Sequence, residues 1–278
     1  MLSKSCLDLW KEESQQLGIV TFCKDLDLAL GGSGVPIGQI TEFCGPPGSG
    51  KTQLCIQLSV STQIPPELGG LGGKTMYFDT NFGFTPQRLE EMATGCVQHC
   101  RKLVDLHRKG LAYAVKDFTV DRLLEGVYYK HVQQCPELLN GIDSLELLLK
   151  SKEKVKLIVL DSISYLIRNN IENTMERIRI GYTILTKLHA LSNQYKCAVI
   201  ITNDVTTRFN PNDPNSSMVV PALGESHSHR INQRVILGPS SNDEPGTIVA
   251  SIGKSLLRPS ATVKFQVTEA GIRRFRKK

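Results

Sequence analysis

The sequence predicts an α/β fold: a mostly parallel, twisted sheet with helices on both faces and an antiparallel edge at its C-terminal end. Three observations lead to this prediction. Runs of β-forming residues alternate with helical patterns along most of the chain, as in a parallel sheet joined by crossover helices. Val155–Asp161 is an apolar run that ends in an acid, which is typical of a buried parallel strand. Three β-rich runs at 233–237, 247–252 and 262–267 predict hairpins at one edge.

Composition places the chain among ordinary globular proteins. It has 278 residues, of which 40% are hydrophobic and 22% charged, and we interpret this length as one domain without internal repeats. No apolar run approaches the roughly 20 residues of a membrane span, and the first six residues lack the pattern of a secretion signal. We therefore expect an intracellular protein without a membrane partner. The net charge of +6 permits nucleic-acid binding without demanding it.

The elements follow in order from the N-terminus. Residues 1–18 are predicted to form a linker helix with Cys6 and Trp10 on its apolar side. The core domain is expected over 19–270, and a short helix with a Gly-rich turn leads into a strand at 39–44.

That strand leads into the sequence Gly45-Pro46-Pro47-Gly48-Ser49-Gly50-Lys51-Thr52, which reads G-x-x-x-x-G-K-T, the phosphate-binding loop. Its glycines let several backbone N–H groups point inward, and the helix predicted after it adds the positive end of a dipole. Lys51 can reach the β- and γ-phosphates of ATP, and the Thr52 hydroxyl can bind Mg²⁺. A glycine- and proline-rich surface turn that matches by chance is the alternative, but the strand before and the helix after favour the phosphate loop.

The second half of the core follows the same alternation. A strand at 74–79 precedes a helix from Pro86 that Thr85 caps, and Thr119 caps another helix at 120–126. After a strand at 127–132, Pro136 begins a helix that Gly141 could interrupt. The remaining elements are the strand that ends at 161, a helix across 178–191, a buried strand at 197–203 and a long mobile loop at 205–221.

Asp161 is the predicted second ligand of the metal. It ends the strongest strand of the chain, and ligands of open α/β sheets bind at the carboxyl ends of strands. We expect it to hold Mg²⁺ through water, opposite Thr52.

Two further features have alternative interpretations. Cys96, His99 and Cys100 could indicate a metal site, but they share one helix and lack a second ligand pair, so reduced, partly buried thiols are favoured. The basic tail at 271–278 holds five basic residues in eight. It is either a solvated terminus or a nuclear import signal or phosphate-contacting segment.

Several stretches together resemble the RecA-like strand-exchange recombinases, specifically the eukaryotic Rad-type recombinase paralogues and, among these, the group lettered C. The resemblance covers about residues 18–267. Many families share the phosphate loop, whereas the ordered set and the hexapeptide Pro221-Ala222-Leu223-Gly224-Glu225-Ser226 are more specific. The other matching stretches are Ile19-Val20-Thr21-Phe22-Cys23, Leu26-Asp27, Gly31-Gly32, Gln53-Leu54-Cys55, Phe78-Asp79-Thr80, the strand that ends in Asp161, and Ile200-Ile201-Thr202-Asn203.

The resemblance implies a RecA-type P-loop ATPase core that binds ATP and Mg²⁺ and acts in homologous recombination and repair of DNA double-strand breaks. It also implies a nuclear protein, in mitotic or meiotic cells, that binds single-stranded or branched DNA and forms a complex with another paralogue. Two DNA-facing loops are expected, at 166–176 and 205–221. Arg168, Arg177 and Arg208 are their candidate phosphate contacts, and for each the alternative is a solvated surface charge.

Three departures from the family pattern bear on catalysis and assembly. Where the family has a Glu that orients the attacking water, this chain has Asn81, and an amide cannot accept a proton. Where the family has a Gln that senses the γ-phosphate, this chain has Asp204, and a carboxylate repels phosphate. As a third departure, we expect the protein to lack the family's N-terminal helical domain and filament-forming linker motif.

These departures lead us to expect ATP binding with weak or absent hydrolysis, in a mediator that works with a partner paralogue. A competent DNA-dependent ATPase that exchanges strands itself is the alternative. A small-molecule P-loop kinase is a third interpretation, which the long polar segment and the β-rich end disfavour.

Overall fold

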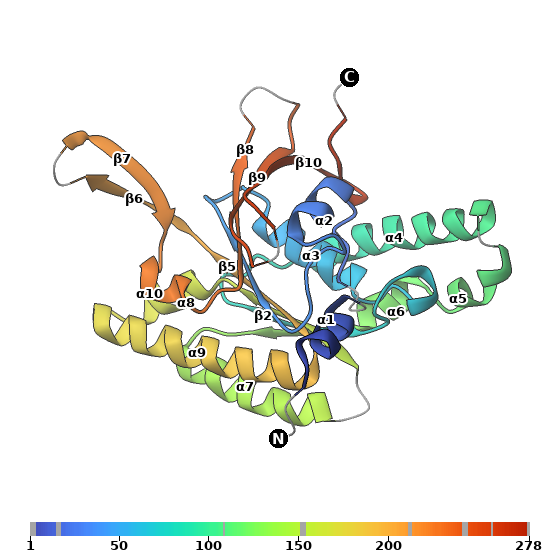
Figure 1. Ribbon diagram of the computed structural model, residues 1–278, viewed down its shortest axis with the longest axis horizontal. Coiled ribbons are helices and arrows are strands. Elements are labelled where there is room, and N and C mark those ends of the chain that lie inside the picture. The colour runs from blue at the N-terminus through green and yellow to red at the C-terminus, as the bar shows by residue number, and fades with distance from the viewer. Residues whose placement is uncertain are drawn as a thin grey trace.

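The structure is a computed structural model, and it describes residues 4–14, 18–107, 109–150, 154–210, 213–240, 244–256 and 258–276. A nine-stranded sheet in the order β11-β10-β9-β8-β1-β5-β4-β2-β3 forms its centre (Figure 1). Its strands are β1 (Ile40–Cys44), β2 (Lys74–Asp79), β3 (Val127–His131), β4 (Val155–Asp161), β5 (Ala198–Asn203), β8 (Gln233–Pro239), β9 (Thr247–Lys254), β10 (Thr262–Thr268) and β11 (Gly271–Arg274).

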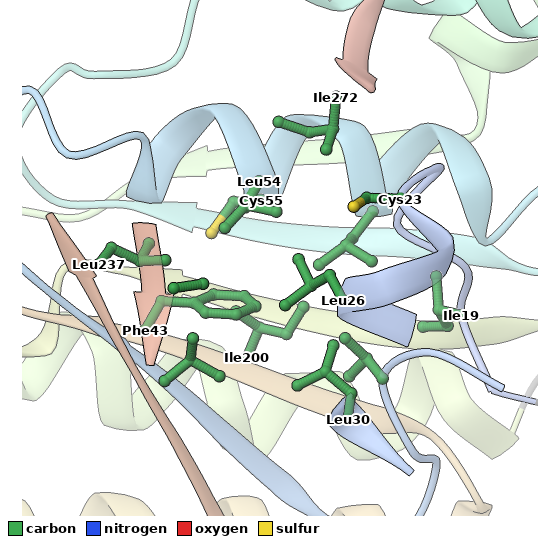
Figure 2. Close-up of a cluster of buried hydrophobic side chains, with 14 of the residues drawn as sticks. Ile19, Cys23, Leu26, Leu30, Phe43, Leu54, Cys55, Ile200, Leu237 and Ile272 are labelled. Carbon is green, nitrogen blue, oxygen red and sulfur yellow. The ribbon is translucent and has the colours of Figure 1, made fainter. Parts of the chain in front are cut away.

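Strands β8, β1, β5, β4, β2 and β3 run parallel, and β9 to β11 add antiparallel pairs at the C-terminal edge. The predicted fold class is therefore confirmed. Alternate residues of the central strands are buried on opposite faces, since Leu157 and Val159 join one core cluster while Ile158 and Leu160 join another. In the first cluster, Phe43 lies among Leu54, Ile200 and Leu237 (Figure 2).

Helices cover both faces. One face carries α3 with α4 and α6, and the other carries α7, α8 and α9 (Figure 1). The helices are α1 (Cys6–Ser14), α2 (Lys24–Leu30), α3 (Lys51–Ser61), α4 (Pro86–His107), α5 (Ala112–Lys116), α6 (Val120–Glu125), α7 (Cys135–Lys150), α8 (Ile163–Asn170), α9 (Thr174–Tyr195) and α10 (Gly224–Ser228), with 3₁₀ turns at Pro66–Leu68 and Lys109–Leu111. None of the described helices combines the length and the apolar character that crossing a bilayer requires.

Helix α7 is continuous through Gly141, so the interruption allowed there is not present. The glycine serves packing instead. A Cβ at this position would lie 2.9 Å from the ring of Phe78, so the missing side chain lets α7 approach β2.

The predicted loop at 205–221 is a β-hairpin, formed by β6 (Val205–Asn210) and β7 (Asp213–Pro221), which extends away from the main sheet (Figure 1). The prediction of a loop was wrong because it followed the Pro, Asn and Ser content of the segment. The segment also contains β-branched residues that pair across the two strands, since Thr206 faces Val220 and Thr207 faces Val219.

The predicted loop at 166–176 was also largely wrong. Helix α8 continues to Asn170, and α9 begins at Thr174 after a short connection. The side chain of Asn173 accepts the N–H groups of Met175 and Glu176, so it caps α9.

The predicted basic tail at 271–278 begins as a strand of the sheet. Ile272 is buried, and its N–H donates to Gln57 Oε1 at 2.9 Å. The Arg273 guanidinium lies 5.1 Å from the Phe22 ring centroid, and Arg274 pairs with Asp25 at 2.8 Å. The residues after 276 lie outside the described ranges.

Cys96 and Cys100 are free, buried thiols in α4. Within the described ranges, no three His, Cys, Asp or Glu side chains are grouped so as to hold a metal ion. The structure therefore favours the interpretation of these cysteines as packing residues.

Candidate functional site

The loop between β1 and α3 has a backbone that requires its glycines. Gly48 and Gly50 have φ values of 78° and 86°, in the left-handed region that side chains disfavour. A Cβ on Gly45 would lie 2.5 Å from the carbonyl oxygen of Leu237. The turn therefore brings the backbone of residues 45–50 round to the start of α3, as an anion-binding loop needs.

Lys51 lies at the first position of α3 and folds back over this loop. Its Nζ donates to the carbonyl oxygens of Gly45 and Pro46 at 2.6 and 3.2 Å. The same Nζ forms an ion pair with Asp204 Oδ1 at 3.2 Å. The buried hydroxyl of Ser49 has no hydrogen-bond partner among the described residues. A phosphate oxygen in the loop would supply a partner for such a donor.

Asp161 ends β4 and is 1% exposed. Its Oδ2 accepts hydroxyl hydrogen bonds from Thr52 at 2.7 Å and Tyr77 at 2.9 Å, and its Oδ1 accepts from Thr202 at 2.5 Å. Burial, together with the charge of Asp161, raises the pKa of Tyr77 well above its usual value, so the phenol remains a donor.

This cluster suits a hard cation. Mg²⁺ prefers oxygen ligands, and the Thr52 hydroxyl and the Asp161 carboxylate already touch at the mouth of the phosphate loop. In the part of the chain that the structure describes, no basic side chain forms an ion pair with Asp161, so its negative charge is balanced only by hydroxyl dipoles. The predicted metal ligands thus lie together, and they fit the predicted ion.

Asn81 lies in the turn after β2, which Asp79 orders. The Asp79 carboxylate accepts the N–H groups of Asn81, Gly83 and Phe84 at 3.1 to 3.3 Å. Asn81 is exposed, and its Oδ1 accepts from Gly83. It lines the same cavity as the phosphate loop, and its position beside a nucleotide stays a prediction.

Asp204 follows β5 and is held from two directions. Its Oδ2 accepts from the Ser164 hydroxyl at 2.9 Å, and its carbonyl accepts from the Ala222 N–H at 2.9 Å, which closes the base of the hairpin. The ion pair with Lys51 links this base to the phosphate loop. The sequence predicted Asp204 near the phosphate as a repulsive group, but it did not indicate that the carboxylate forms an ion pair with Lys51.

These residues surround one cavity of about 540 Å³. The C-terminal strands complete its wall through Gly246, Ile248 and Val267, and Tyr165 lines its other side. Sequence patterns did not indicate these four residues, nor Tyr77, Ser164 and Thr202. The sequence did offer one usable signal. Tyr77 and Thr202 lie near the ends of predicted strands, and the carboxyl ends of parallel strands meet at the edge of the sheet where Asp161 lies.

A second buried carboxylate lies within β1. Glu42 is fully buried; its Oε1 accepts from Asn203 Nδ2 at 2.9 Å and lies 3.0 Å from His227 Nε2, and its Oε2 accepts from Arg234 Nε. Burial alone would raise the pKa of Glu42, but the contacts with His227 and Arg234 outweigh it and lower this pKa to about 2. Asn203 precedes the hairpin and His227 follows it, so the contacts of one carboxylate hold both ends of the hairpin in place.

The three candidate DNA contacts are not equivalent. Arg168 is exposed near the end of α8, and Arg208 is exposed on β6 of the hairpin. Arg177 is half-buried, and it donates to the carbonyl oxygens of Ile171 at 2.6 Å and Arg168 at 3.3 Å. Its guanidinium thus stabilises the turn between α8 and α9, and less of it is free for a phosphate.

Comparison with known proteins gives a consistent result. The family model described as Rad51 matches residues 12–275. DNA repair protein RAD51 homolog 3 of Cricetulus griseus is 35% identical over 97% of this chain and 72% of its own length. The protein of the same name from Dictyostelium discoideum is 36% identical over 92% of this chain and 65% of its own length. DNA repair protein RAD51 homolog 2 of Homo sapiens is 31% identical over 89% of this chain and 66% of its own length. The chain therefore spans about two thirds of the length of each of these relatives.

Proposed function

The chain belongs to the Rad51 family, and from that premise we propose that it is an ATP-binding paralogue that acts in homologous recombination and DNA repair. It binds ATP with Mg²⁺ and hydrolyses it weakly or not at all. It works in the nucleus as a mediator, in complex with another paralogue and on single-stranded or branched DNA. The arrangement of Lys51, Thr52 and Asp161 around one cavity is the observation that carries this proposal.

Nucleotide binding follows from the groups that remain in place. The backbone N–H groups of the loop and the start of α3 would hold the phosphates, and Lys51 would leave its carbonyl partners to pair with them. Thr52 and Asp161 would hold Mg²⁺, which supplies charge neutralisation of the phosphates when bound. Asp161 is buried with its charge unpaired, and this supports the assignment.

Weak hydrolysis follows from two side chains. Asn81 has no basic group with which to take a proton from water, and its amide oxygen already accepts from Gly83. Asp204 places a negative charge 3.2 Å from the ammonium that would otherwise stabilise the transferred phosphate. Bound ATP would then act as a ligand that stabilises the fold and its complexes.

A DNA role is supported by the names of the relatives and by two exposed arginines. Arg168 and Arg208 lie on α8 and on the hairpin, which are the two segments expected to face DNA. Contacts of this kind bind phosphates without reading sequence, so the affinity should fall as salt rises.

The test is nucleotide binding measured beside single-turnover hydrolysis on the full chain, with and without single-stranded DNA. We expect Mg²⁺-dependent ATP binding with no DNA-stimulated turnover. Lys51→Ala should remove the binding, whereas Lys116→Ala on distant α5 should keep it. The double variant Asn81→Glu with Asp204→Gln restores both family residues and should gain DNA-dependent turnover. Rapid turnover by the unchanged chain would support the competent ATPase instead.

A further inference from the structure

A second cavity, of about 410 Å³, lies between α8, α9 and the start of α10, away from the nucleotide. Its floor is apolar, since Ile167 and Leu185 are buried there and Leu223 is half-buried. The base of the hairpin reaches its edge through Thr206. The cavity therefore joins the two segments that the proposed function places against DNA.

Gly181 keeps this cavity open. It lies in the interior of the 22-residue helix α9, where glycine costs about 1 kcal/mol relative to alanine. Its φ is not in the left-handed region, so the backbone does not require a glycine. Among the described residues, a Cβ here would touch only Ile167 Cδ1, at 3.4 Å. The missing side chain thus has one clear structural effect, which is to leave space over the apolar floor.

The mouth of the cavity is cationic. Arg168, Arg177 and Arg230 line it, and none of the lining side chains that the structure describes is acidic. Arg230 lies 4.1 Å from the centroid of the exposed Tyr182 ring and donates to its hydroxyl. Because Arg177 is engaged with backbone carbonyls, Arg168 and Arg230 are the guanidinium groups that remain for an anion.

We propose that this cavity receives one base of a single-stranded nucleic acid, with the neighbouring backbone phosphates on Arg168 and Arg230. An apolar recess beside cations fits a flat, weakly polar group attached to an anionic chain. A single strand can place a base there at low cost because its bases are not paired, whereas a duplex must first unstack and unpair one. The inference rests on the proposed DNA-binding function and adds the part of the strand that the protein recognises.

Two labelled oligonucleotides of equal length distinguish recognition of the base from recognition of the backbone. One is an oligothymidine, and the other is an abasic strand with the same phosphates. Binding is measured by fluorescence anisotropy on the full chain, on Gly181→Leu, which fills the recess, and on Ala190→Leu, which adds the same side chain to the exposed face of α9. Gly181→Met fills the same space with a more flexible chain and replaces the leucine variant if that variant does not fold.

The unchanged chain and Ala190→Leu should prefer oligothymidine over the abasic strand by roughly 5-fold or more, because only oligothymidine can bury a base against the apolar floor. Gly181→Leu should lose that preference while it binds the abasic strand as before. Arg168→Ala should weaken both strands alike and reduce the salt dependence.

A preference that survives in Gly181→Leu, or an equal loss of both strands, would overturn the base site while leaving DNA binding in place. Loss of paralogue binding in Gly181→Leu with the DNA preference intact would assign the recess to a protein side chain. Failure of the unchanged chain to bind either strand would overturn the proposed DNA function and this inference together.

Discussion

Two buried carboxylates lie close to the carboxyl end of the same sheet, and they are neutralised in different ways. Glu42 contacts Arg234 and His227, so its charge is matched by basic side chains. Among the residues that the structure describes, the Asp161 carboxylate accepts hydrogen bonds only from the hydroxyls of Thr52, Tyr77 and Thr202. A buried ion pair is complete by itself, whereas a buried carboxylate without a counter-charge is favourable only if a cation arrives. We propose that this difference separates a structural clamp at Glu42 from a metal ligand at Asp161.

The largest expected effect comes from Glu42→Gln. The amide would turn an N–H₂ group towards Arg234 and leave that guanidinium without its counter-charge, so we expect a loss of about 3–5 kcal/mol in the free energy of unfolding. Urea unfolding measures it, with Glu90→Gln on the exposed face of α4 as the matched control. A loss below about 1 kcal/mol would mean that Glu42 is not a clamp.

Acid should remove the same contribution from the unchanged chain. The pKa of Glu42 is about 2 in the folded protein, against an ordinary value of 4.5 that applies to the unfolded chain. A depressed carboxyl pKa adds stability that is complete above the unfolded value and lost as pH falls through the folded one. We expect about 3 kcal/mol to disappear between pH 4.5 and pH 2. Glu42→Gln should flatten this part of the pH profile, and an unchanged profile would contradict the assignment.

Asp161→Asn should affect stability far less in the absence of nucleotide. Its amide oxygen can still accept from Thr52 and Tyr77, and its N–H₂ group can donate to the hydroxyl of Thr202, so we expect a change within about 1 kcal/mol. The variant should instead lose stabilisation by Mg²⁺ and ATP, which amounts to about 2.7 kcal/mol at a hundredfold excess over Kd. Thermal unfolding with and without Mg²⁺ and ATP separates the two. Strong destabilisation without ligand would make Asp161 a structural residue like Glu42.

The smallest expected effect comes from Asp204→Asn. The variant frees Lys51 from its ion pair and removes a charge that repels phosphate, so ATP affinity should rise by roughly 2- to 5-fold, as for a partly exposed pair. A nucleotide titration measures this, with Asp105→Asn on α4 as the control. Weaker binding would show that Asp204 supports the nucleotide rather than competing with it.

Much of the fold was predictable because its signals are local. The phosphate loop has a fixed spacing, and the buried strands that end at Asp161 and Asn203 are apolar runs. The hairpin at 205–221 and the strand at 271–274 were missed for one reason. Polar and basic residues dominate these segments, and their strand structure depends on partners such as Val219 for Thr207 and Gln266 for Arg273.

The sequence by itself determined the class of fold, the phosphate loop and the acid that ends the strongest strand, since each depends on a pattern of neighbouring residues. Only the tertiary structure decided what surrounds the two carboxylates. The partners of Glu42 lie 161 to 192 residues away along the chain, and Thr52 lies 109 residues from Asp161. The open space over Gly181 is likewise a property of three packed helices. Charge pairing and cavity shape depend on distances in space, and a linear pattern does not encode those distances.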